Sequence, residues 1–450
     1  MIEKKKALEI LKKAMARSRS DMIEAVLEGS RLSLTRFAES KISDNIDTEE
    51  TQLYIRCVKD KKIGVNVTGD ISDNGIKQAV ADCEAVLAYV NPDDKFVSLP
   101  KPDNAALKED FGMPGTSDFG PKQRAEAVQL AEGIAHKANA RVSGAFRIDE
   151  TCLAIANSLG MQRFFTGNSA ELSLTISGDD KNSGWAMEFN PDASRLDIQR
   201  LAKKATMKAA TSRNPIALPS GQYTVILEPA AVGQLLLLLS FLGFGCKTFY
   251  QQRSFMAGKI GQKIAGDYFT VIEDPTDTDF NFQPFDYEGV ARKKVDLISG
   301  GIARGVVYNS YYANLMQTES TGHALAPNNN FGPYPKTLVV APGNVSSEEL
   351  IKTTEKGILI THFWYLNYLN PMKTMVTGTT IDGTFLIENG VIDSPIKNMR
   401  TNESILEAFS NIQAISNDRI IYPQYSVLMK VPAMKIANFS LITEEDQNKC

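Results

Sequence analysis

Residues 223–242 read YTVILEPAAVGQLLLLLSFL, and this stretch decides the fold of the second half of the chain. The segment Tyr223–Leu227 predicts a strand, and it runs directly into an apolar helix over 229–242. The most apolar part, Leu235–Leu242, is far shorter than the roughly 20 residues that a bilayer crossing needs. The sequence therefore predicts a buried helix rather than a membrane span.

Beyond this helix the chain predicts a mainly antiparallel β domain, which we place at 220–450. The dipeptides Gly300-Gly301, Asp382-Gly383 and Asn389-Gly390 predict hairpin turns. Ser346 followed by Glu349 predicts the capped start of a short helix. Strands are expected at 268–273, 295–299, 303–308, 337–341, 357–361, 374–380, 384–389 and 424–440.

Residues 1–215 predict an N-terminal α/β domain. A strand meander closed by a helix occurs twice, in 21–90 and in 142–212, which we interpret as a weak internal repeat. Within the first meander, Gly29-Ser30 and Lys59-Asp60 are predicted turns. The fold class is therefore α+β, with two strand-meander-plus-helix halves followed by a β domain that contains a buried helix.

The composition argues against several classes of function. The chain has 450 residues and a formal net charge of -4, so no global field favours nucleic acid or acidic lipid. Its five cysteines are scattered, which suits a reducing compartment. Charged residues occupy the N-terminal stretch where a signal peptide has its apolar core. We expect a cytoplasmic protein that does not bind membrane, and no nucleic-acid site is evident in the sequence.

Only three histidines, His136, His323 and His362, are available for a metal site or a catalytic triad. None has a second ligand at the spacing that zinc sites show. His136 is expected on a solvated helix face. His323 lies in a turn-like stretch and His362 at the end of a strand, and we favour a structural role for both.

Several segments, in this order along the chain, resemble the TldD/PmbA family. The most specific is TGTTIDGTFLIENG at 377–390, and FMAGKIGQKI at 255–264 and PFDYEGV at 284–290 also match. Shorter matches occur at 54–58 with 63–65, at 297–301, at 320–323 and at 363–365. The resemblance therefore spans most of the chain.

The resemblance implies a division of roles. TldD-type members hold a metal through an HExxxH motif and a cysteine near the C-terminus, whereas PmbA-type members, also called TldE, lack these ligands. Aligned on Gly233, the three motif positions fall on Leu237, Leu238 and Leu242. Leucine can neither ligate a metal nor exchange a proton. The region of the C-terminal cysteine, 428–434, has no ligand, and Cys450 lies far beyond it.

The resemblance thus implies a PmbA/TldE-like subunit of a cytoplasmic peptidase system that degrades peptides or processes peptide precursors. We expect no cofactor in this chain, zinc only in a TldD-type partner, and assembly with that sister or with itself. An extended peptide could pair with a strand edge. The candidate cleft residues are Thr321, Gly322, His323, His362, Phe363, Tyr365 and Asn367.

Two alternatives remain open at this point. The first is a free-standing peptidase with a composite site that uses His323 or His362. The second is a gyrase-modulating binding protein without a peptidase role.

Overall fold

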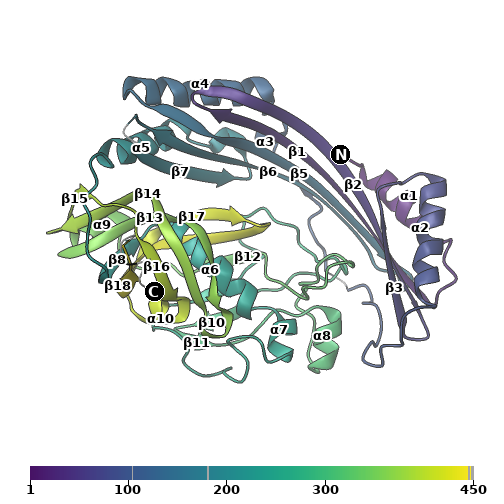
Figure 1. The fold of residues 1–450 in the computed structure, drawn as a ribbon. Helices are drawn as coiled ribbons and strands as arrows, with labels where there is room; N and C mark the ends of the chain where they lie inside the picture. Colours follow the sequence, from purple (N-terminus) through teal and green to yellow (C-terminus); the bar gives the residue numbers. More distant parts are fainter. Residues whose placement is uncertain (104, 180–181, 444–445, 447–450) are drawn as a thin grey trace.

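The computed structural model in Figure 1 describes residues 1–103, 105–179, 182–443 and 446, so Cys450 lies outside the described residues. Within that part of the chain, the strands form one seven-stranded and one eleven-stranded sheet, and helices pack against both. The predicted α+β fold class is confirmed.

The first sheet is built from very long strands in the order β3-β2-β1-β5-β6-β4, with β7 paired to β6. The predicted turn at Gly29-Ser30 is wrong, because β1 runs straight through it and turns only at Glu39 and Ser40, where φ is positive. Gly29 instead allows close packing, since a Cβ there would lie 2.8 Å from Sγ of Cys152. The strands are β1 (Met22–Ala38), β2 (Lys41–Lys59), β3 (Lys62–Thr68), β4 (Asp110–Phe111), β5 (Arg141–Asn157), β6 (Gln162–Ser177) and β7 (Ser183–Asn190).

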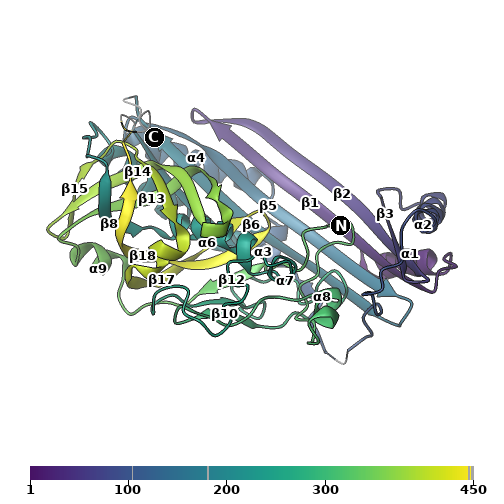
Figure 2. The ribbon, with the colours of Figure 1, turned by 60° about the horizontal axis from the view of Figure 1, so that its bottom comes forward.

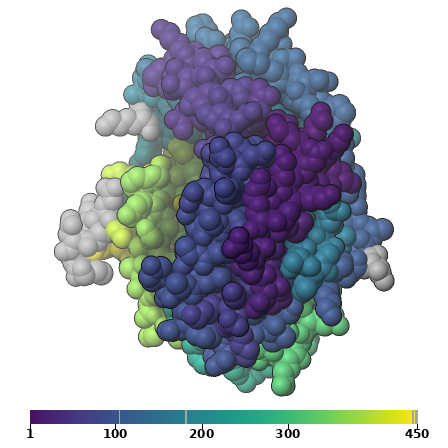
Figure 3. Space-filling model, turned by 90° about the vertical axis from the view of Figure 1, so that its right-hand side faces the viewer, coloured from purple at the N-terminus to yellow at the C-terminus, as the bar shows by residue number. Residues whose placement is uncertain are grey.

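Helices cover one face of this sheet and leave the other face to the second half of the chain (Figure 1). On β1, Ile23, Ala25 and Leu27 pack under the first two helices, whereas Val26 packs toward Phe285. Each half has three strands followed by a helix, namely β1–β3 with α2 and β5–β7 with α5. The helices are α1 (Lys4–Met15), α2 (Asp73–Val86), α3 (Pro114–Ser117), α4 (Pro121–Lys137) and α5 (Ile198–Thr211). Figure 3 shows the end of the molecule that the first hundred residues cover.

The second sheet follows the order β11-β10-β9-β12-β18-β8-β13-β14-β15, with β16 on β14 and β17 on β18. Most neighbours are antiparallel, but β8 runs parallel to β13 and β12 parallel to β18. The strands are β8 (Gly221–Leu227), β9 (Val271–Glu273), β10 (Val295–Ser299), β11 (Ile302–Ala303), β12 (Thr337–Val340), β13 (Lys356–Asn370), β14 (Met375–Glu388), β15 (Val391–Pro395), β16 (Arg400–Ser404), β17 (Ile412–Gln424) and β18 (Val427–Leu441).

Some of the turns and strands predicted for the second half are present in the structure, and others are not. Gly300-Gly301 and Asn389-Gly390 do form turns between paired strands, and Ser346 accepts a hydrogen bond from the Glu349 amide. The predicted turn at Asp382-Gly383 is wrong, because both residues lie inside β14. There Thr361 faces two residues instead of one, which makes a β-bulge. Strand β17 was not predicted, and of the expected strand 303–308 only Ala303 lies in a ladder strand, β11.

Helix α6 (Pro229–Gly243) is the buried helix of the second half, as predicted. It packs on β13 and β18, and its side chains belong to the largest apolar core (Figure 2). The other helices here are short: α7 (Cys246–Tyr250), α8 (Ser310–Leu315), α9 (Ser347–Lys352) and α10 (Ile405–Ser410). In the part of the chain that the structure describes, no helix is long and apolar enough to span a membrane.

The packing of α6 predicts a loss of stability in Gly233→Ala. A Cβ at Gly233 would lie 2.5 Å from Cδ1 of Tyr422, a ring that is itself buried. Overpacking costs about 1–3 kcal/mol, and the better helix propensity of alanine offsets at most about 1 kcal/mol. The variant should therefore unfold at a lower urea concentration than the wild type.

Gly133→Ala is the matched control, because Gly133 lies inside α4 with no atom within 4 Å of an added Cβ. The free energy of unfolding of this control variant should rise by about 0.5–1 kcal/mol. Equal shifts in the two variants would contradict the packing of Gly233 against Tyr422.

Candidate functional site

The leucines on α6 lie among apolar and hydroxyl groups. Leu237 is 2% exposed, whereas Leu238 and Leu242 are half-buried. Ser240 donates to the Leu237 carbonyl at 2.7 Å, and Tyr368 donates to the Leu238 carbonyl at 2.7 Å. The helix therefore presents side chains that suit packing, and the hydroxyls around it are engaged by its own backbone.

These surroundings do not fit a metal ion. Among the residues that the structure describes, no three His, Cys, Asp or Glu side chains are grouped as metal ligands. The residue nearest to Leu242 along the chain that could ligate a metal is Cys246. It is buried, and burial raises the pKa of its thiol to about 12. Since the thiolate is the metal-binding form, this cysteine is a poor ligand. No chemical step through a metal can be assigned to α6.

An aromatic layer covers the C-terminal end of α6. The ring of Phe241 stacks on Tyr334 with centroids 5.2 Å apart and meets the edge of Phe331 at 5.7 Å. Tyr425, from the turn between β17 and β18, lies 6.5 Å from Phe241 and is 75% exposed. The layer offers apolar surface to a ligand beside the leucine positions.

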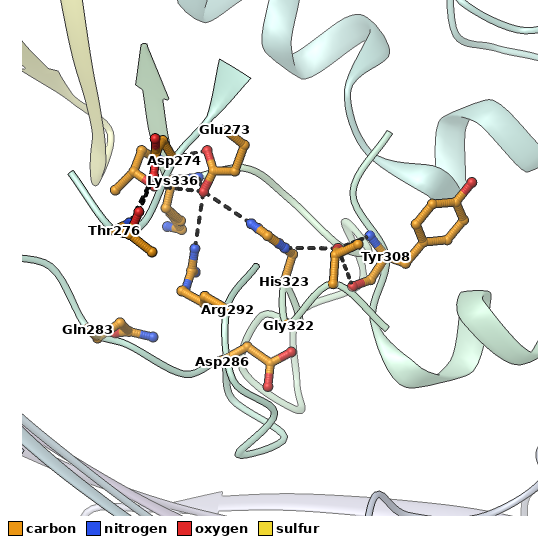
Figure 4. A network of polar contacts seen from close by, with 12 residues as sticks. Glu273, Asp274, Thr276, Gln283, Asp286, Arg292, Tyr308, Gly322, His323 and Lys336 are labelled. Atoms are coloured by element: carbon orange, nitrogen blue, oxygen red, sulfur yellow. Dashed lines mark hydrogen bonds and ion pairs between the residues drawn. The ribbon is translucent and has the colours of Figure 1, made fainter. Parts of the chain in front are cut away.

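His323 lies in a buried polar network, shown in Figure 4. Its Nε2 lies 3.1 Å from Oε1 of Glu273, and its Nδ1 lies 2.9 Å from Oγ1 of Thr321. Burial lowers the pKa of His323, so the neutral ring is favoured. The Thr–His–Glu arrangement looks like a catalytic triad, but His323 has no exposed surface, and Thr321 is also bonded to the backbone of Tyr308.

The rest of this network consists of polar and charged groups that the sequence analysis did not connect with His323. Glu273 also accepts hydrogen bonds from Arg292 at 3.3 Å and from the amide and hydroxyl of Thr337. Asp286, within the PFDYEGV segment, accepts three backbone amides, and burial, with the nearby charge of Glu288, raises its pKa to about 8. The network supports the loops around Gly322, whose φ is +72°. Its role here is to hold the backbone.

His362 lies in a second cluster, where the two halves of the chain meet. Its Nε2 lies 3.0 Å from Oδ2 of Asp382, and its ring packs on Trp185 of β7 at 4.5 Å. Nearby, Lys208 of α5 reaches Glu228, the residue before α6, at 2.5 Å. Burial lowers the pKa of Lys208 to about 8. The histidine has an orienting carboxylate, but in the described part of the chain no hydroxyl or thiol bonds to its ring.

The other predicted residues on β13 run from the core to the surface. Phe363 is buried, and its amide and carbonyl bond to the side chain of Gln234 on α6. Tyr365 is 73% exposed with a φ of +52°, and Asn367 is exposed on the same strand. Trp364, Leu369 and Met372 are also exposed, and we call residues 364–372 the β13 tip. The predicted residues on β13 thus occupy two separate environments, since Phe363 lies in the core and Tyr365 and Asn367 lie on the exposed tip.

A buried ion cluster joins the first sheet to the second half. Arg56 of β2 lies 3.4 Å from Glu24 of β1 and 3.5 Å from Glu288. Glu24 is fully buried, and neither of its carboxyl oxygens has a hydrogen-bond partner among the described residues. Burial raises the pKa of Glu24 to about 7, although Arg56 opposes the rise. Sequence patterning missed this cluster because each member sits in an ordinary alternating strand or loop.

A cleft of about 510 Å³ separates the open face of β5 and β6 from the turn between β17 and β18. The loop 280–283 forms its third wall. Figures 1 and 2 show β17 and β18 reaching under β6. This cleft lies beside Tyr425, so the aromatic layer over α6 and the open face of the first sheet border one space.

Comparisons with known proteins agree with this architecture. The PmbA/TldA metallopeptidase C-terminal domain matches residues 220–443. The metalloprotease PmbA homolog of Haemophilus influenzae is 25% identical over 407 residues, covering 88% of this chain and 87% of that protein. Metalloprotease PmbA of Escherichia coli O157:H7 is 24% identical, covering 94% of each chain.

Solved structures show the same fold. TldE from Thermococcus kodakarensis superposes with a TM-score of 0.87 at 23% identity, covering 97% of this chain and 100% of that one. A Thermotoga maritima protein named for a modulator of DNA gyrase gives a TM-score of 0.85 at 17% identity, covering 96% and 99%.

Proposed function

This chain belongs to the TldD/PmbA family, and from that premise we propose that it is a PmbA/TldE-like subunit of a cytoplasmic peptidase system. In this proposal the chain helps to hold peptide while a TldD-type sister carries the zinc. The system degrades peptides or processes peptide precursors.

One observation carries the proposal. Leu237, Leu238 and Leu242 stand where the family resemblance places the metal ligands, and Leu237 is part of the core. A helix that packs through these positions supplies neither a Lewis acid nor a general base. The chain keeps the family fold without metal-ligating side chains at these three positions, which supports an auxiliary role.

The β13 tip supports assembly with another chain. Trp364 is 63% exposed and Tyr365 73% exposed, and Met372 lies on the same projection. Exposed aromatic residues are enriched at the centres of protein interfaces. We place the contact with the TldD-type sister, or with a second copy of this chain, at this tip.

The test combines metal analysis with peptide cleavage. Purified chain should hold less than about 0.1 equivalent of zinc after dialysis and should cleave no unfolded peptide. Adding a TldD-type partner should yield a complex that cleaves the peptide faster than the partner alone. We expect so little zinc because a catalytic zinc site needs three protein ligands, and this chain has leucine at the three aligned positions.

Matched surface variants test the contact. Trp364→Ser with Tyr365→Ser should weaken the complex at least 10-fold in sedimentation, as expected for buried aromatic contacts. Tyr268→Ser, which removes another exposed aromatic, should leave it unchanged. One tightly held metal per chain, or cleavage by the chain alone that His362→Ala abolishes, would favour the composite-site peptidase. Co-purification of gyrase in place of a TldD-type chain would favour the binding-protein alternative.

A further inference from the structure

The cleft under the first sheet contains an unpaired carboxylate. Glu171 points from β6 into the cleft, on the face opposite Leu172, which packs under the helices. The residue is half-buried, and its carboxylate makes no hydrogen bond or ion pair with any residue that the structure describes, although its backbone pairs with both neighbouring strands. A carboxylate in such a position normally finds a partner, so this one is available to a ligand.

The cross-strand neighbours of Glu171 explain why it is unpaired. Arg147 of β5 stands directly opposite in the ladder, at a spacing where opposite charges usually pair. Arg147 instead donates two hydrogen bonds to Asp149 on its own strand, one of them at 2.7 Å. On the other side the neighbour is Phe189 of β7, which is apolar. The charges of Arg147 and Asp149 balance, so the cleft keeps one net negative charge at Glu171.

The cleft walls add aromatic surface around this charge. Phe189 of the first sheet, Phe282 of the loop and Tyr425 of the turn between β17 and β18 are partly or fully exposed, whereas Phe165 and Phe280 line the cleft from buried positions. Aromatic faces attract cations and pack against methylene chains. The combination of one anion and several rings matches a group that has a positive charge on an apolar stem.

We propose that this cleft binds a cationic group of an extended peptide, with the carboxylate of Glu171 receiving the ammonium or guanidinium. The inference rests on the proposed peptide-binding function and assigns it a substrate preference. The cation comes from a basic side chain or from the peptide's N-terminus. Either source fits a cavity of about 510 Å³, which lies within the usual size of ligand pockets.

The charges around Glu171 also give the binding a pH dependence. Burial raises the pKa of Glu171 to about 7, Arg147 opposes the rise, and Asp149 adds to it. Tyr422 of β17 also lies close enough for its charge to interact with Glu171, but its pKa is raised, so it stays neutral. Every other residue that lines the cleft, on β5, β6, β7, the loop 280–283 and the ends of β17 and β18 with the turn between them, has an uncharged side chain. Because only the ionised carboxylate attracts the ligand, affinity should rise between pH 6 and pH 8.

The experiment uses three fluorescent eight-residue peptides and the full chain, alone and in complex with a TldD-type partner. One peptide has a blocked N-terminus and a central lysine, the second replaces that lysine with norleucine, and the third has norleucine and a free N-terminus. At pH 8 at least one cationic peptide should bind about 10-fold more tightly than the blocked norleucine peptide, as a charge-assisted hydrogen bond predicts. The cationic peptide that shows this preference identifies the source of the charge.

Glu171→Gln should reduce the preference to less than about 2-fold and remove its pH dependence. It should fold normally, because a neutral amide avoids the burial cost that raises the pKa of Glu171. Glu126→Gln, the same change on exposed α4, should keep the full preference. If the preference survived in Glu171→Gln, the cleft would not be the site that binds the cation, although the chain would still bind peptide. No binding of any peptide by the chain or its complex would overturn the proposed function as well.

Discussion

Replacing Arg56 with methionine is expected to lower the free energy of unfolding by about 3–5 kcal/mol, the usual cost of removing one partner from a buried ion pair. The reason is that Glu24 and Glu288 would both remain buried without a cation between them. Glu288 keeps a hydrogen bond from the Ser310 amide, but Glu24 keeps none among the described residues. Urea unfolding of the full chain, followed by circular dichroism, measures the change.

The loss should be larger at pH 8 than at pH 6. The pKa of Glu24 in the folded chain, about 7, lies above the ordinary value of a glutamate. The folded state therefore holds a proton that the unfolded state releases, and this contribution to stability is lost as the pH rises through 7. Without Arg56 the pKa of Glu24 rises further, so the ionised form at pH 8 becomes still more costly.

A double variant provides the control. Glu24→Gln together with Arg56→Met removes one of the two uncompensated carboxylates and should recover part of the loss, by at least about 1 kcal/mol. If the single and double variants unfolded at the same urea concentration at pH 8, Glu24 would not depend on Arg56 as the distances indicate.

Leu237→Ala is expected to cost about 2–5 kcal/mol, because the truncated side chain would leave a cavity in the core around α6. Leu238→Ala, one residue further along the helix and half-buried, should cost clearly less. Equilibrium unfolding of both variants measures the difference. Similar costs at the two positions would mean that Leu237 is not packed as the structure shows.

This pair of leucines bears on function as well as stability. Leu237 packs in the core, so its side chain contributes to stability. A polar metal ligand in its place would be buried without hydrogen-bond partners. Introducing the HExxxH residues at 237, 238 and 242 is therefore expected to lower the free energy of unfolding, and most of the loss should come from the change at Leu237.

Much of the architecture could be predicted from the sequence, and α6 shows why. A short run of leucines flanked by a strand leaves only one low-energy placement, inside the core. The segment 377–390 also identified the family, because its order of residues is specific. Element boundaries are harder to predict: the sequence predicts turns at Gly29 and Gly383, although one lies in a continuous strand and the other in a bulge.

The candidate site was harder to predict for a physical reason. His323 and His362 were chosen by residue type, but their roles depend on partners far away in sequence, Glu273 and Asp382. Glu171 gave no signal at all, since an alternating strand accepts a glutamate at any solvent-facing position. Its character appears only when Arg147 is seen bonded to Asp149 instead.

The polar contacts between the halves of the chain have a mechanical consequence. Arg56 binds Glu288 near one end of the long first sheet, and Lys208 of α5 binds Glu228, the residue before α6, near the other. The first sheet is thus held against the second half near both ends, and a hydrogen bond from Asn281 to the carbonyl of Phe111 holds it beside the cleft as well. We expect these contacts to hold the cleft walls at a nearly constant separation, so that a ligand is selected by how well it fits that width.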